Sequence, residues 1–149
     1  MLFLYYAKKD LYWYICFWWL FDKEFDVDTK QFFNKVINDK ITIIVSETVE
    51  TELKNAPDNV KAFYDSIPKE IIQIVDNTDE ITALANKYVE ANIVSKKYFP
   101  DCLHIAAAII NNADVLVSWN FKHLVNFERK KKYRFKIILL QINRLLLLY

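Results

Sequence analysis

The chain has 149 residues, of which 54% are hydrophobic and 26% are charged, and its formal net charge is +1. This length and composition predict one globular domain over residues 1–149 and exclude a disordered chain. The near-neutral charge excludes a general electrostatic attraction to nucleic acid. The absence of glycine excludes a P-loop and a dinucleotide-binding fingerprint, which need glycine where the backbone approaches phosphate.

An aromatic and apolar segment runs from Leu11 to Phe21 and overlaps an atypical N-terminal region, residues 1–20. It has about half of the roughly 20 residues that a membrane-spanning helix needs, and charged residues precede it. We therefore expect no membrane anchor, and the aromatic bias favours a buried strand. Cys16 and Cys102 lack metal-ligand spacing, so we expect free thiols in a reducing, cytoplasmic compartment.

A helix, a strand and two further helices are predicted between residues 28 and 67. Asp28 or Thr29 can cap the first helix, and Ser46 caps the second, which ends before Pro57. The segment Ile41–Ser46 is rich in β-branched residues, which predicts a strand buried on both faces. The apolar positions at three- and four-residue steps are Phe32, Phe33, Val36 and Ile37, then Val49, Leu53 and Ala56, then Val60, Phe63 and Ile67.

The second half of the chain continues the alternation. A strand is predicted at Ile71–Val75, followed by a helix that begins near Thr78. Pro100 suits the first turn of the next helix. Two more strands are predicted at Asp114–Trp119 and Phe135–Leu140, and we expect the latter to be the last element. Strands that alternate with helices predict an α/β fold with three α/β/α layers around a central, mostly parallel sheet.

Ligands bind beyond the carboxyl ends of the strands in such a sheet, and few polar residues fall there. They are Glu52, Asp101, Ser118 and Asn120. Oxygen ligands that converge from separate elements suit a hard cation such as Mg²⁺. Each residue also has a simpler interpretation, because a helical Glu is usually solvated and an Asp at a helix start is usually a cap. For His104, buried packing is favoured over metal binding.

Three stretches resemble the PIN-domain family, in particular its VapC-like members. They are SETVETEL (Ser46–Leu53), PDCLHIAAAIINNADVLVSWNFKHLV (Pro100–Val125) and FDKEF (Phe21–Phe25), and the resemblance extends over roughly Phe21 to Glu128. It implies a PIN-like α/β/α fold and a ribonuclease that depends on Mg²⁺ or Mn²⁺, acts on RNA and serves as the toxin of a toxin–antitoxin pair. An antitoxin protein and a second copy of the chain are the implied protein partners.

The resemblance also implies roles for individual residues. Glu52 occupies the second acidic position of the family and Asp101 the third, and both would bind the metal. Asn120 stands where many relatives carry a further Asp, and Ser118 lies two residues before it. We expect Asn120 to bind the metal, and both residues to orient the metal or its water as part of the catalytic set.

The first acidic position of the family aligns with Trp13, so the central carboxylate is missing and impaired activity is expected. Trp18 and Trp19 must be encoded TGG TGG, which reads Gly-Gly one base later, and the family has Gly-Gly there. One hypothesis is that residues 6–20 are an out-of-frame reading, and recovery of the Asp then needs TGA at Trp13. The alternative is a genuine divergent strand.

The segment Arg129–Lys136 gathers basic residues around Tyr133 and Phe135, and it is either a phosphate contact or a solvated loop. Two alternatives to the ribonuclease stay open. The chain is then a non-catalytic PIN scaffold that binds RNA or a protein partner, or the product of a pseudogene.

Overall fold

The fold is a six-stranded sheet between helical layers, as seen in a computed structural model that describes residues 12–15, 26–92, 95–118, 136–141 and 144–148. The strand order is β3-β2-β1-β4-β5-β6, and the pairs are parallel except for β5 and β6, which are antiparallel. The strands are β1 (Tyr12–Ile15), β2 (Thr42–Ser46), β3 (Ile72–Val75), β4 (Val115–Ser118), β5 (Lys136–Gln141) and β6 (Arg144–Leu148).

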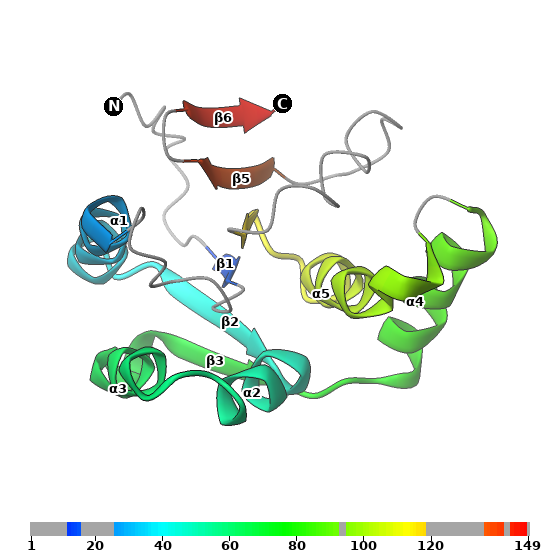
Figure 1. Cartoon of the computed structure of the whole chain (residues 1–149), viewed down its shortest axis with the longest axis horizontal. Helices are drawn as coiled ribbons and strands as arrows, with labels where there is room; N and C mark the ends of the chain where they lie inside the picture. Colours follow the sequence, from blue (N-terminus) through cyan, green and yellow to red (C-terminus); the bar gives the residue numbers. More distant parts are fainter. Residues whose placement is uncertain (1–11, 16–25, 93–94, 119–135, 142–143, 149) are drawn as a thin grey trace.

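Helices cover both faces of this sheet, so the predicted three-layer α/β/α architecture is confirmed. Figure 1 shows α1 and α3 on one side of the strands, and α4 and α5 on the other. The α-helices are α1 (Asp26–Asn38), α2 (Glu47–Lys54), α3 (Asp58–Ser66), α4 (Asp79–Glu90) and α5 (Phe99–Ile110), and the short 3₁₀ helices are η1 (Lys69–Ile71) and η2 (Lys96–Tyr98).

The strand predictions hold in position, with small shifts at the ends. The strand predicted within Leu11–Phe21 is present as β1, where Ile15 is fully buried, whereas residues 16–21 lie outside the described residues. The first helix begins at Asp26, earlier than predicted, so Asp28 and Thr29 lie within its first turn and are not its caps. Of the two predicted free thiols, Cys102 is confirmed as free and buried, and Cys16 is not among the described residues.

The prediction that the strand near Phe135–Leu140 ends the fold is wrong. A sixth strand, β6, follows β5 after a two-residue connection and pairs with it in antiparallel register, from Gln141 opposite Arg144 to Ile137 opposite Leu148. Two-residue connections are the commonest between antiparallel strands that follow one another in the chain. The strand was missed because its leucine run lacks the β-branched residues that mark the other strands.

The starts of the helices follow from capping residues in the sequence. Ser46 is the N-cap of α2, as predicted, and its Oγ accepts a hydrogen bond from Val49 N at 3.5 Å. Thr78 caps α4 in the same way, through a 3.3 Å bond from Ile81 N. Pro100 lies in the first turn of α5, where its missing N–H costs nothing.

The ends of three helices are reached without glycine. Lys40, Asn92 and Asn112 take left-handed backbone conformations, with φ of 51°, 52° and 52°. After α1, Lys40 N donates to Ile37 O and the next amide donates to the Val36 carbonyl. This is the paired bond pattern of a Schellman motif, which usually places glycine at the left-handed position.

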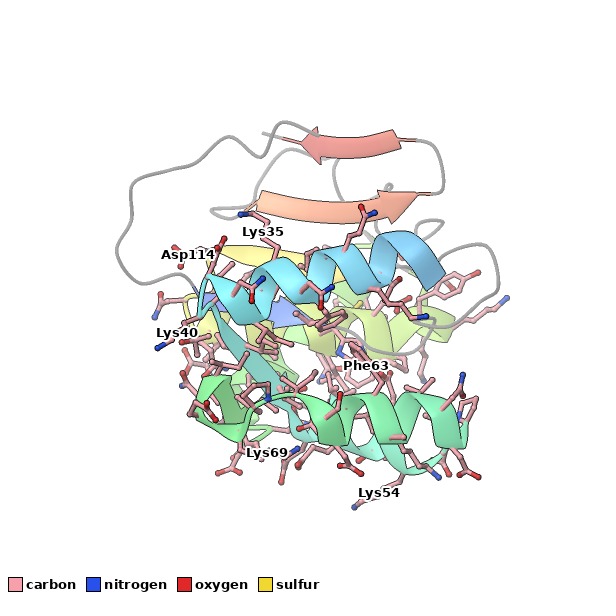
Figure 2. The ribbon with its side chains drawn as sticks, turned by 90° about the vertical axis from the view of Figure 1, so that its left-hand side faces the viewer. Lys35, Lys40, Lys54, Phe63, Lys69 and Asp114 are labelled. Carbon is pink, nitrogen blue, oxygen red and sulfur yellow. The ribbon has the colours of Figure 1, made fainter. Side chains whose placement is uncertain are left out.

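The core on the α1 side of the sheet is aromatic. The rings of Phe32 and Phe33 on α1 lie 5.2 Å apart at 88°, and those of Phe33 and Phe63 lie 4.8 Å apart at 75°. Figure 2 shows Phe63 between α3 and α1. Both pairs have the edge-to-face geometry that aromatic rings favour, so α1 and α3 are joined across this layer.

Candidate functional site

Glu52 and His104, from different helices, form a partly buried polar pair. Glu52 belongs to α2, which begins at the carboxyl end of β2, and His104 belongs to α5. His104 Nε2 lies 2.9 Å from Glu52 Oε1. The His104 side chain is 6% exposed and that of Glu52 is 26% exposed. An ionised carboxylate can only accept hydrogen bonds, so the imidazole donates from Nε2 when Glu52 is charged.

The second oxygen of Glu52 is left without such a contact. Glu52 Oε2 is buried, and no hydrogen-bond partner for it exists in the described part of the chain. Burial of an unsatisfied carboxylate oxygen is costly, so this atom needs a cation, a proton or a donor to compensate it. Glu52 is therefore not the solvated surface group that a helical Glu usually is.

Asp101 lies in the first turn of the same helix as His104, three residues before it, and is half-buried. Residues three apart on a helix are neighbours on its surface. Because His104 contacts Glu52 directly, Asp101 lies one helical turn from a residue that touches Glu52. Burial, and after it the charge of the adjacent Asp101, raises the pKa of the Cys102 thiol to about 11.

The other predicted site residues are Ser118 and Asn120. Ser118 ends β4, next to β1 at the carboxyl edge of the sheet, but its side chain is not described. Asn120 lies outside the described residues, as does the basic segment apart from Lys136, which starts β5. Among the residues that the structure describes, no group of three or more His, Cys, Asp or Glu side chains is arranged to hold a metal ion.

Trp13, the residue aligned with the first acidic position of the family, lies within β1. Trp13 pairs with Ile43 and Val115, whereas Ser46 and Ser118 mark the carboxyl ends of the neighbouring strands. The pairing therefore puts the Trp13 backbone before the edge at which the metal site was expected.

A separate open groove of about 590 Å³ lies between α2 and α3. Its lining residues are Glu50, Leu53, Lys54, Lys61, Tyr64 and Asp65. Partial burial, and after it the charges of Glu50 and Asp65, raise the pKa of Tyr64. Glu52 does not line this groove, so the groove is distinct from the Glu52–His104 pair.

Sequence reasoning missed the partner of His104. The sequence favoured packing for this side chain, and the side chain is buried. The signal that was available is the spacing of Asp101 and His104, which puts them on adjacent turns of one helix. Nothing in the sequence indicated that Glu52, which lies 52 positions earlier, would contact His104.

Comparison with known proteins supports the fold. A chain in the crystal structure of VapBC2 from Rickettsia felis, bound to a DNA fragment from its promoter, superposes with a TM-score of 0.56 at 17% sequence identity. The match covers 85% of this chain and 98% of that one. No family profile matches the sequence, and no curated protein matches it. The likeness shows a PIN-like fold.

The described helices also bear on the membrane question. None of them is both long and apolar enough to cross a membrane.

Proposed function

We propose that this PIN-like fold carries a metal-dependent ribonuclease of the VapC toxin type, impaired by the missing first carboxylate. The observation that supports it most is Glu52, a carboxylate with one oxygen held by His104 and the other buried without a partner in the described segments. Asp101 supplies a second carboxylate one turn from His104. Two carboxylates with several waters suit Mg²⁺ or Mn²⁺.

In this proposal, Glu52 and Asp101 bind the ion, and Ser118 and Asn120 complete the set from the end of β4 and beyond it. The bound ion would lower the pKa of a water and neutralise charge on the attacked phosphate of RNA. The chain's own contribution is to fix the two carboxylates on α2 and α5. The Ser46 cap and the Glu52–His104 contact both act on the position of α2.

The test is cleavage of single-stranded RNA by the full chain, with Mg²⁺ or Mn²⁺ and with EDTA. We expect weak cleavage that needs the metal and that Glu52→Gln and Asp101→Asn each abolish. Asp79→Asn is the matched control, because Asp79 lies in the first turn of α4 as Asp101 does in α5, and its loss removes the same favourable interaction with a helix N-terminus. Cleavage that survives both site substitutions would refute the proposal.

One observation favours a second candidate, a non-catalytic scaffold that binds RNA or a protein partner such as an antitoxin or its own copy. In the described segments no three acidic, histidine or cysteine side chains form a metal cluster. RNA binding that weakens with salt, without cleavage under any metal, would favour the scaffold. A stable complex with an antitoxin-like protein, again without cleavage, would favour the protein-binding form.

A further inference from the structure

The contact between His104 and Glu52 has a feature that packing alone does not require. His104 is nearly fully buried, yet its Nε2 reaches only one of the two carboxylate oxygens of Glu52, at 2.9 Å. A buried imidazole needs a partner for its ring N–H, and many groups can serve, including backbone carbonyls. Here the partner is a carboxylate on another helix, 52 positions away.

The contact restricts the carboxylate. A Glu side chain has three rotatable bonds and loses substantial rotamer freedom when it is fixed. With Oε1 held by His104, rotation of the carboxylate is limited, and Oε2 is the oxygen that remains for another ligand. Oε2 is also the atom that lacks a hydrogen-bond partner among the described residues. The two oxygens of Glu52 thus differ: Oε1 is bonded to His104, and Oε2 is left for another ligand.

We infer that His104 is a positioning residue for Glu52: its Nε2–H holds Oε1, and this orients Oε2 toward a divalent cation that Asp101 shares. The inference rests on the proposed function, which supplies the cation. It goes beyond the proposed function because it gives His104, for which the sequence favoured packing, a role in orienting Glu52. Groups that hydrogen-bond to a ligating side chain typically change metal affinity by about 10- to 100-fold when they are removed.

The purely structural alternative is that His104 only ties α5 to α2. The two roles differ in what must be preserved at position 104. To join α5 to α2, the side chain at position 104 needs only a similar volume and some polar contact. To orient the Glu52 carboxylate, it needs a hydrogen-bond donor at the place of Nε2. The amide of Gln reaches about as far as Nε2, and the shorter amide of Asn reaches only to the place of Nδ1.

The decisive experiment compares His104→Gln with His104→Asn in the full chain, by titration with Mn²⁺ alone and by thermal unfolding. Glu52→Gln gives the affinity of a site without this carboxylate. We expect His104→Gln to bind Mn²⁺ within about threefold of the parent chain and His104→Asn to bind about 10- to 100-fold more weakly. Thr78→Ala, which removes the N-cap of α4 and no side chain of the candidate site, is the control for a general loss of stability.

Equal Mn²⁺ affinities of the Gln and Asn variants, alongside weaker binding by Glu52→Gln, would overturn the positioning role and leave the proposed function intact. Mn²⁺ affinity that is unchanged in Glu52→Gln and in Asp101→Asn would instead overturn the metal site, and the positioning role with it. The two failures are therefore distinguishable in one set of titrations.

Discussion

The edge-to-face contact between Phe33 on α1 and Phe63 on α3 can be measured as a coupling energy. Phe33 is 1% exposed, and its ring lies 4.8 Å from that of Phe63 at an interplanar angle of 75°. We expect Phe33→Leu and Phe63→Leu each to lower the free energy of unfolding by about 1–3 kcal/mol, with the larger loss at the fully buried Phe33. The pair itself contributes about 0.5–1.5 kcal/mol beyond the area that the rings bury.

The assay is a double-mutant cycle by urea unfolding, with the two single variants, the double variant and the parent chain. The double variant should be more stable than the sum of the single losses predicts, by about 0.5–1.5 kcal/mol, because the ring pair can be lost only once. Phe32→Leu with Phe63→Leu is the matched control, since Phe32 pairs with Phe33 on its own helix. A coupling energy below about 0.3 kcal/mol, the range of independent sites, would refute the packing of α3 on α1.

Three further outcomes are expected. Ser46→Ala and Thr78→Ala each remove a helix cap, and each should lower the free energy of unfolding by about 1 kcal/mol and Tm by about 2–4 °C. Only Ser46→Ala should also weaken Mn²⁺ binding, because α2 carries Glu52. With the other cysteine replaced by serine, Cys102 should react with a disulfide reagent at pH 8 only after unfolding, because it is buried and its pKa is raised to about 11. For Tyr64, the raised pKa means that the unfolded chain loses its phenolic proton first. Stability is then complete below pH 10 and falls as the pH rises through the folded pKa, and Tyr64→Phe should flatten that fall in alkaline unfolding curves.

Local signals in the sequence were enough to predict most of the fold. The β-branched run before Ser46, the cap at Thr78 and the proline at position 100 each act within a few residues of the element that they define. β6 was missed because its pairing with β5 depends on a partner strand and its leucines give no strand signal of their own. Local propensity is least informative where a neighbouring strand decides the structure.

The candidate site was harder to predict, for a related reason. Glu52 and Asp101 were selected as candidates from the ends of predicted elements and from family resemblance, and their role in metal binding stays a prediction. The burial of Glu52 Oε2 and the bond between Oε1 and His104 depend on how α2 packs against α5, which no spacing within either helix encodes. The register of β1 likewise depends on its pairing with β2 and β4, and a sequence alignment does not fix strand pairing.

The three left-handed helix ends have a consequence for the energetics of a chain that contains no glycine. A lysine in this conformation costs roughly 1 kcal/mol, whereas asparagine tolerates it better, so Lys40 is the most expensive of the three. The same absence of glycine restricts the denatured ensemble, which has fewer backbone states to surrender on folding. Backbone strain at these helix ends thus destabilises the folded state, whereas the restricted denatured ensemble lowers the entropy cost of folding.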